Sequence, residues 1–187
     1  MGLQRWSSLS PVNTNYSIRL EQAEDIASLR ALNEAAFGQP LEAQLVDRLR
    51  QGIQPWHSWV AEQEGSLVGH ILFTPVSVHG GESGSEEEWT ALGLGPMGVL
   101  PGLQKQGIGS ALIRTGLEAL RGAGEQVVFV LGHPSYYPRF GFVPAGPLGL
   151  TCKWPVPDGA FMVAELEAGA LQGRRGRIEY HPAFDEV

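Results

Sequence analysis

A glycine- and glutamine-rich turn between a strand and an amphipathic helix constrains this chain more than any other feature. Residues 95–112 read Gly-Pro-Met-Gly-Val-Leu-Pro-Gly-Leu-Gln-Lys-Gln-Gly-Ile-Gly-Ser-Ala-Leu. The strand is expected to end at Pro101 and the helix to begin near Gly107. The first amides of a helix lack intrahelical acceptors and favour anions, and glycines let a phosphate approach the backbone without meeting a Cβ. The turn is therefore predicted to bind a phosphate group.

Three phosphate-binding patterns compete for this region. Gly93–Gly98 fits the dinucleotide pattern G-x-G-x-x-G, but it lies inside the predicted strand and no helix follows it, so we treat it as a coincidence. Gly102–Gly107 begins like a P-loop, but the next residues are Ile and Gly where Lys and Ser or Thr are needed, which leaves nucleotide binding as a remote alternative. Gln104–Gly109 reads Q-x-x-G-x-G and lies in the expected strand–turn–helix context.

Hydrophobic periodicity divides the chain into strands and helices. Strands are expected at 16–20, 58–63, 67–78, 89–100, 126–131, 142–143 and 161–166, and helices at 22–37, 40–52 and 107–121, with a short aromatic turn or helix in 133–141 and an irregular loop at 146–160. The expected inner faces are Ile26, Leu29, Asn33, Ala36 and Phe37 in the first helix, Leu41, Leu45 and Leu49 in the second, and Ile108, Ala111, Leu112, Thr115 and Ala119 in the third. Hairpins in the first half and one β-α-β crossover in the second predict a mixed sheet covered by helices, an α/β (α+β) fold. Residues 1–15 are expected to be a polar leader and residues 16–187 a single domain.

Composition and charge exclude several classes of protein. The net charge is −7 and there is no basic stripe, which argues against a nucleic-acid partner. The longest apolar run, 127–132, is far shorter than the ~18 residues of a membrane span, so no membrane partner is expected. The single cysteine, Cys152, cannot form a disulfide within the chain, and it indicates a structural thiol in a reducing, cytoplasmic compartment. No cluster of His, Asp or Glu in the sequence suggests a metal.

The turn and a downstream aromatic segment together resemble a known family. The Q-x-x-G-x-G pattern after Val99-Leu-Pro101 is similar to the acetyl-CoA pyrophosphate loop of the GNAT superfamily of N-acyltransferases. Tyr136-Tyr-Pro-Arg-Phe-Gly-Phe142 resembles the family's Y-x-x-x-G-F segment, and the longer string from Val128 resembles the YhbS-like branch of predicted bacterial acetyltransferases. The resemblance implies a GNAT-type mixed, mostly antiparallel sheet that is splayed at its centre and flanked by helices, with acetyl-CoA as cosubstrate and no metal.

The resemblance also implies a role for individual residues. The residues implied to bind acetyl-CoA are Met97, Gly98 and Val99 along the pantetheine arm, Gln104 at the opening of the loop, and Lys105, Gln106, Gly107, Ile108, Gly109 and Ser110 around the pyrophosphate. Tyr137 would lie beside the sulfur as a catalytic hydrogen-bond donor to the leaving thiolate. Because a phenol of pKa ~10 is a weaker acid than a thiol of pKa ~8.5, a hydrogen bond is safer than full proton transfer.

The resemblance therefore implies an acetyl-CoA-dependent N-acetyltransferase in which a primary amine of a small molecule or peptide attacks the thioester directly in a ternary complex. A non-catalytic acyl-CoA-binding sensor or interaction module of the same fold is the alternative. Glu34, His70, His133 and Asp158 are candidate bases, and none has a distinctive spacing. The 146–160 loop is expected to wall the acceptor pocket, and the net charge of −7 would favour a cationic acceptor but is also ordinary for a soluble bacterial protein. The protein is expected to be a monomer or homodimer.

Overall fold

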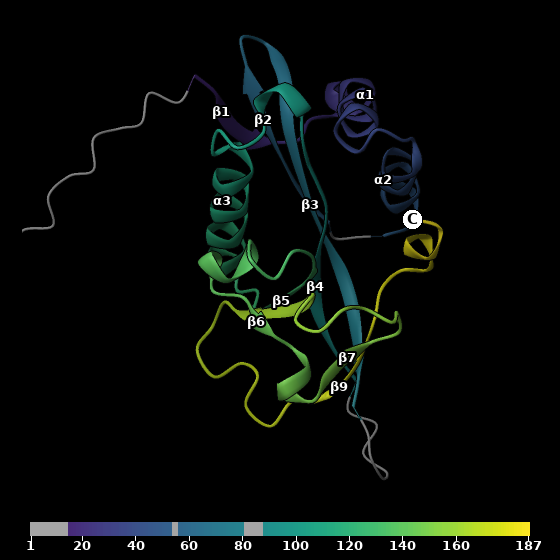
Figure 1. The fold of residues 1–187 in the computed structure, drawn as a ribbon, viewed down its shortest axis with the longest axis vertical. Coiled ribbons are helices and arrows are strands. Elements are labelled where there is room, and N and C mark those ends of the chain that lie inside the picture. Colours follow the sequence, from purple (N-terminus) through teal and green to yellow (C-terminus); the bar gives the residue numbers. More distant parts are fainter. Residues whose placement is uncertain (1–14, 54–55, 81–87) are drawn as a thin grey trace, which may run out of the picture.

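The strands of the described chain form one mixed sheet, and helices cover both of its faces (Figure 1). The structure is a computed structural model that describes residues 15–53, 56–80 and 88–187. The strands are β1 (Ser17–Leu20), β2 (His57–Gln63), β3 (Ser66–His79), β4 (Glu88–Val99), β5 (Val127–Leu131), β6 (Val143–Pro144), β7 (Leu150–Cys152), β8 (Phe161–Glu165) and β9 (Gly176–Glu179). Their order is β1-β2-β3-β4-β5-β8-β6, and the pairs are antiparallel except for β4–β5 and β7–β9. The mixed, mostly antiparallel sheet flanked by helices that was expected from the sequence is confirmed.

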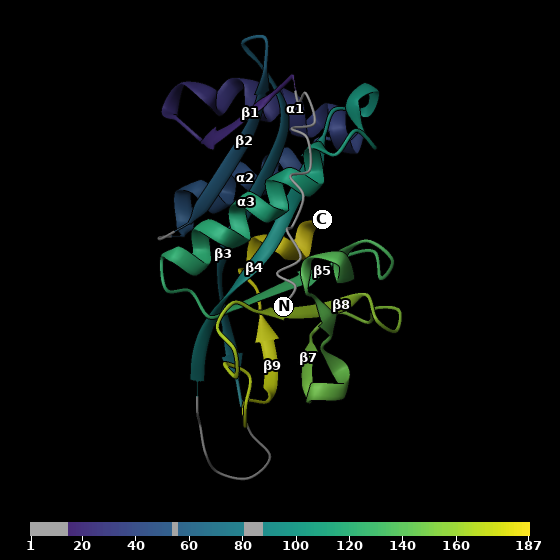
Figure 2. The same cartoon turned by 90° about the vertical axis from the view of Figure 1, so that its left-hand side faces the viewer.

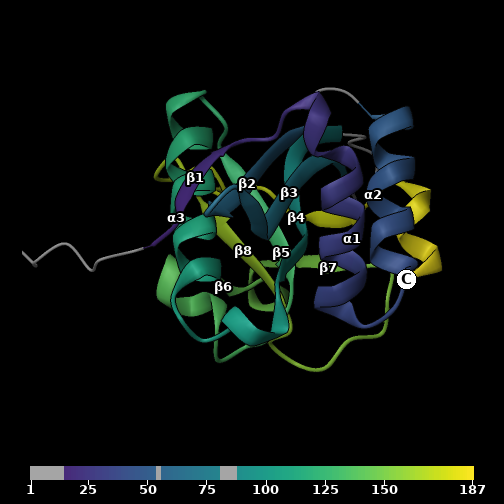
Figure 3. The ribbon, with the colours of Figure 1, turned by 90° about the horizontal axis from the view of Figure 1, so that it is seen from above.

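Three helices cover the sheet, with α3 (Ile108–Gly122) on one face and α1 (Ile26–Phe37) and α2 (Leu41–Gly52) on the other (Figures 1 and 3). Gly38 ends α1 in the left-handed region at φ 73°, as glycine at a helix C-terminus commonly does. Short 3₁₀ turns lie at Ala23–Asp25, Pro101–Leu103, Tyr137–Phe140, Gly146–Leu148 and Pro182–Glu186. The core beneath α3 is dominated by large apolar side chains of β3, β5 and the helix itself.

The sheet opens between β4 and β5 (Figure 2). These parallel strands pair only from Leu92–Leu94 to Val128–Val130. On the other side of β4, the register against β3 shifts between Ile71 and Phe73, which is a β-bulge at Gly95 and Pro96. A bulge bends its strand, so β4 turns away from β5 at this point. Beyond the bulge, β4 pairs with β3 alone as far as Val99. This separation of β4 from β5 is the splay that was expected at the centre of the sheet.

Two strands were missed by the sequence prediction. The 146–160 segment was expected to be a loop, but it contains β7, and 161–166 was expected to be the last strand, but β9 follows it. β9 pairs with the far end of β3, at Ser77–His79, and with β7. Both strands are short, and in β9 only Ile178 is buried, so neither carries a clear alternation in the sequence.

The inner faces of the helices differ from the predicted ones. In α1 the buried residues are Leu29, Leu32 and Asn33, while Ile26 and Phe37 are exposed. In α2, Leu45 and Leu49 are buried as expected and Leu41 is exposed. In α3 the buried residues are Ile108, Leu112, Ile113, Gly116, Leu117 and Leu120, whereas Ala111 and Thr115 are only half-buried and Ala119 is exposed. The small side chains of Ala111, Thr115 and Ala119 therefore lie at the edge of the helix face that packs on the sheet.

Some expectations fall outside the described residues. The polar leader expected at 1–15 lies there almost entirely. Within the described part of the chain, none of the helices has the length and apolar character needed to cross a membrane.

Candidate active site

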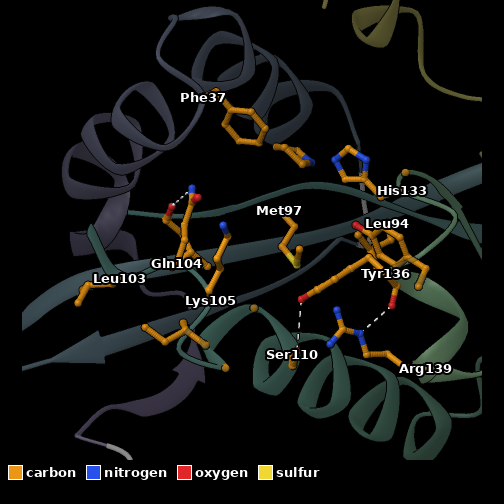
Figure 4. A pocket seen from close by; sticks show the side chains of 18 of the residues that line it. Phe37, Leu94, Met97, Leu103, Gln104, Lys105, Ser110, His133, Tyr136 and Arg139 are labelled. Carbon is orange, nitrogen blue, oxygen red and sulfur yellow. Dashed lines mark hydrogen bonds between the residues drawn. The ribbon is translucent and has the colours of Figure 1, made fainter. Parts of the chain in front are cut away.

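A cavity of about 850 Å³ opens where β4 and β5 separate (Figure 4). The two strands, the first turn of α3, the turn at Tyr137–Phe140 and the end of α1 bound it. Its volume is typical of a site for a cofactor-sized molecule. Its lining residues are Phe37, Leu94, Gly95, Pro96, Met97, Val99, Leu103, Gln104, Lys105, Gly107, Ile108, Gly109, Ser110, Leu131, Gly132, His133, Tyr136, Tyr137 and Arg139.

The glycine-rich turn forms one end of the cavity. The Gln104 side-chain amide donates to the Val99 carbonyl oxygen at 3.1 Å, and that of Gln106 donates to the Gly102 carbonyl oxygen at 3.2 Å. Lys105 and Gly107 have φ values of 63° and 92°, in the left-handed region that glycine adopts most easily. These two bonds and two left-handed residues turn the chain sharply from the end of β4 into α3.

The first turn of α3 presents unpaired backbone donors to the cavity. The first α-helical bond runs from the Ala111 amide to the Gly107 carbonyl oxygen, at 2.9 Å. The amides of Ile108, Gly109 and Ser110 precede that bond, and all three residues line the cavity. Such amides, at the positive end of the helix dipole, form an anion-binding site.

The end of β4 directs backbone groups into the gap. The Leu100 amide donates to the Val68 carbonyl oxygen at 3.0 Å, and Gly69 faces Val99 in the register. In an antiparallel ladder, bonded and unbonded pairs alternate. The N–H groups of Val99 and Met97 therefore point away from β3, into the space that β5 leaves open. The backbone groups of Gly98 face β3 instead.

Tyr137 is held at the centre of the cavity wall. It is 7% exposed, and its ring packs edge-on against Tyr136 and Phe142. Burial raises the pKa of its phenol above the ordinary value of 10.0, with a further contribution from Tyr136. The phenol therefore stays protonated at neutral pH. On the neighbouring ring, the Tyr136 hydroxyl lies 3.4 Å from Ser110 Oγ, which joins this wall to the start of α3 (Figure 4).

Two cations are the charged side chains of the lining, Lys105 and Arg139. Arg139 Nε donates to the Tyr136 carbonyl oxygen at 2.9 Å, and its guanidinium lies 4.2 Å from the centroid of the Tyr136 ring. These contacts hold the guanidinium near the first turn of α3 (Figure 4). Among the described residues that line the cavity there is no Asp or Glu.

Most of the site residues predicted from the sequence are brought together, and two are not. Met97, Val99, Gln104, Lys105, Gly107, Ile108, Gly109, Ser110 and Tyr137 line the cavity. Gly98 is not among the lining residues and packs against α1 instead. An added Cβ there would lie 2.9 Å from Ala36 Cβ, so the absence of a side chain lets α1 pack closely on β4. Gln106 does not line the cavity either, because its side chain closes the turn. Sequence reasoning missed Phe37 and Arg139 as site residues, although Arg139 lies within the quoted aromatic segment.

Of the four candidate bases, only His133 lines the cavity. It follows the end of β5 and lies on the same side of Met97 as Phe37 (Figure 4). Glu34 bonds to Arg30 on α1, and neither it nor Asp158 is among the lining residues.

His70 is buried outside the cavity, in a network of polar side chains. Its Nε2 lies 3.1 Å from Ser58 Oγ and its Nδ1 3.2 Å from Asn33 Nδ2. Ser58 donates to Glu21 at 2.5 Å, and Glu21 accepts from Arg50 at 2.6 Å. Burial, with a smaller contribution from Arg50, lowers the pKa of His70 to about 3. A base so weak, which is fully buried and does not line the cavity, has a structural role.

The 146–160 segment contributes no residue to the cavity lining. Trp154 packs instead against Tyr180, with ring centroids 5.3 Å apart. The thiol of Cys152 is half-buried and lies 3.6 Å from the Trp154 carbonyl oxygen. The expectation that this loop walls the pocket is therefore not met by the cavity described above.

The comparison with known proteins assigns the family. Residues 17–145 match the model of the acetyltransferase (GNAT) domain. The chain is also 35% identical over 169 residues to the uncharacterized N-acetyltransferase YhbS of Escherichia coli K12, which covers 90% of this chain and 98% of YhbS. The chain belongs to the GNAT acetyltransferases. As a GNAT acetyltransferase it is an enzyme, so membership disfavours the non-catalytic module.

Solved structures of GNAT relatives share its fold. The crystal structure of E. coli YhbS in complex with CoA has a TM-score of 0.80 at 34% identity, over 91% of this chain and 92% of that one. A GNAT acetyltransferase from Brucella melitensis in complex with acetyl-CoA has a TM-score of 0.70 at 37% identity, over 91% and 98% of the two chains. At these identities and coverages, the likeness extends through the strands and helices that form the cavity.

Proposed function

We propose that this GNAT chain transfers an acetyl group from acetyl-CoA to a primary amine of a small molecule or peptide by direct attack in a ternary complex. The observation that carries the proposal is one continuous cavity. It joins the free amides of the first turn of α3 to the gap between β4 and β5. Both relatives described above were crystallised with CoA or acetyl-CoA, which supports the same cosubstrate here.

The residues present fit acetyl-CoA. The amides of Ile108, Gly109 and Ser110 would hold the pyrophosphate, and Lys105 and Arg139 would balance its charge. The open N–H of Val99 and the open carbonyl oxygen of Met97 would bind the pantetheine arm as a strand does. The gap in the sheet leaves room for that arm. Acetyl-CoA supplies an activated acetyl thioester at the end of it.

Three groups of the chain are placed to assist the transfer. The Met97 amide, near Val99, would donate to the carbonyl oxygen of the thioester as negative charge develops on it. Tyr137, with its raised pKa, would donate a hydrogen bond to the sulfur as the C–S bond breaks and the thiolate leaves. His133 would accept the proton that the amine loses as the N–C bond forms.

We further propose that residues 16–187 act as a single domain and that the enzyme is cytoplasmic, which the single cysteine supports. We expect a monomer or a homodimer, and sedimentation equilibrium distinguishes the two.

Thermal unfolding in the presence of acetyl-CoA, CoA, ATP or NADH tests the cosubstrate. A ligand at 100 times its Kd adds about 2.7 kcal/mol to the free energy of unfolding, which raises Tm by roughly 5–11 °C for a chain of this size. We expect that rise with acetyl-CoA and CoA. A rise with ATP alone would support the P-loop alternative and contradict the proposal.

A further inference from the structure

The two ends of the cavity differ in chemistry. Lys105, Arg139 and the free amides lie at the end formed by α3. His133 and, two residues before it, Leu131 lie at the end of β5, and Phe37 lies on the same side of Met97 as His133; none of the three is formally charged. Figure 4 shows Phe37 and His133 on the side of Met97 that lies away from Ser110 and Arg139. The phosphates of acetyl-CoA would therefore bind at the end formed by α3, and the acceptor would bind at the other end.

The acceptor end exposes large apolar side chains. Phe37 is 37% exposed and Leu131 43% exposed, and both line the cavity from different elements, the end of α1 and the end of β5. Apolar side chains exposed inside a concave site gain free energy when an apolar group covers them. An acceptor with an aliphatic or aromatic group beside its amine would make that contact.

The charge of the lining points in the same direction. A second ammonium group on the acceptor would lose water on entering the cavity, and among the described lining residues it would find no carboxylate to pair with. The net charge of −7 therefore does not describe the site, because the acidic side chains that produce it do not line the cavity.

We propose that the acceptor is a monoamine carried on an apolar group, which Phe37 and Leu131 hold while the amine faces His133. This inference rests on the proposed acetyl transfer and specifies its substrate class. It excludes polyamines and other polycations as preferred acceptors.

The test compares 2-phenylethylamine with 1,4-diaminobutane, two primary alkyl amines that differ in the apolar group and in the second charge. Release of CoA thiol from acetyl-CoA gives kcat/KM for each, and calorimetry gives the binding of each to the CoA-loaded protein. We expect a preference of at least about tenfold for 2-phenylethylamine, the range that pocket contacts of this kind provide. Equal or preferential use of 1,4-diaminobutane, or failure of 2-phenylethylamine to bind at millimolar concentration, would overturn the inference.

Two variants locate the effect. Leu131→Glu places a carboxylate at the acceptor end and should shift the preference toward 1,4-diaminobutane by about tenfold. Leu148→Glu is the matched control, because Leu148 is 41% exposed and does not line the cavity. An unchanged ratio in Leu131→Glu would contradict the placement of the acceptor. The Kd for CoA, measured on each protein, separates this inference from the proposed function, since failure to bind CoA contradicts the proposed function whichever amine is preferred.

Discussion

The ring of Tyr137 lies directly on the backbone of Gly132. A Cβ at position 132 would come within 2.2 Å of the ring carbon Cε2, so only glycine leaves room for the ring in its present place. Gly132 follows β5 at the point where the strand leaves β4, and both residues line the cavity. The absence of a side chain at Gly132 therefore determines the position of the Tyr137 hydroxyl relative to the gap between β4 and β5.

Gly132→Ala should displace the Tyr137 ring and reproduce much of the defect of Tyr137→Phe. If Tyr137 donates to the leaving thiolate, both variants should lose about 10- to 100-fold in kcat, toward the lower end of acid catalysis. Their Kd for acetyl-CoA should change by less than about threefold, because the phosphate-binding turn is untouched. Gly122→Ala is the control, since a Cβ there meets nothing within 4 Å. Full kcat in Gly132→Ala would show that the position of the ring does not matter.

His133→Gln should lower kcat by about 100-fold and leave the Kd for acetyl-CoA unchanged, because the amide cannot take up the proton of the amine. His79→Gln controls for the loss of a histidine, as His79 is exposed at the far end of β3 and pairs with Glu179. Steady-state kinetics with saturating acetyl-CoA measures the effect. Equal rates for the two variants would remove His133 from the mechanism.

Arg139→Gln should weaken acetyl-CoA binding by about tenfold, or about 1.4 kcal/mol, because a partly exposed guanidinium would lose its attraction to a phosphate. The difference from the wild-type protein should shrink as salt is raised, since exposed charges are screened. Arg177→Gln serves as the control from the exposed side of β9. Calorimetric Kd values at two ionic strengths that do not separate Arg139→Gln from Arg177→Gln would contradict this role.

The buried His70 makes stability depend on pH. Its pKa is about 3 in the folded protein and 6.5 as an ordinary value, so the unfolded chain takes up a proton that the folded chain does not. Stability is unaffected by this group above pH 6.5 and falls as the pH drops below it. The loss should approach about 1.4 kcal/mol per pH unit between these two pKa values and end near pH 3. Urea unfolding of the wild-type protein and of His70→Gln between pH 7.5 and about 4.5 measures the difference in slope. If the free energies of unfolding of the two proteins changed in parallel with pH, the pKa of His70 would not be lowered in the folded state.

The parts of the molecule that depend on local sequence were predictable, and the parts that depend on distant packing were not. The turn at Gln104–Ser110 follows from neighbouring residues, because its glycines, its glutamines and the start of α3 lie within one short segment. β9 pairs with β3 about a hundred residues away in the chain, so its four residues carry no local signal. The same holds for Phe37, which reaches the cavity only because α1 packs across β4 at Gly98.

The inner face of α3 shows a second limit. Periodicity alone favoured the row through Ala111, Thr115 and Ala119, but the sheet buries the adjacent row that contains Ile113 and Leu117. Gly116 belongs to the buried row because a Cβ there would lie 2.6 Å from Phe73. A glycine that admits a neighbouring ring cannot be distinguished from other glycines until the ring is placed.

The central claim is that the turn before α3 holds the phosphates of acetyl-CoA, and calorimetric titration of acetyl-CoA into three proteins tests it most directly. Gly107 and Gly124 have φ values of 92° and 88° and no atom within 4 Å of an added Cβ, so Gly107→Val and Gly124→Val carry similar backbone strain. Only Gly107 lines the cavity. We predict that the wild-type protein and Gly124→Val bind alike and that Gly107→Val binds at least about 100-fold more weakly, a loss of about 2.7 kcal/mol. Wild-type affinity in a folded Gly107→Val would contradict the claim.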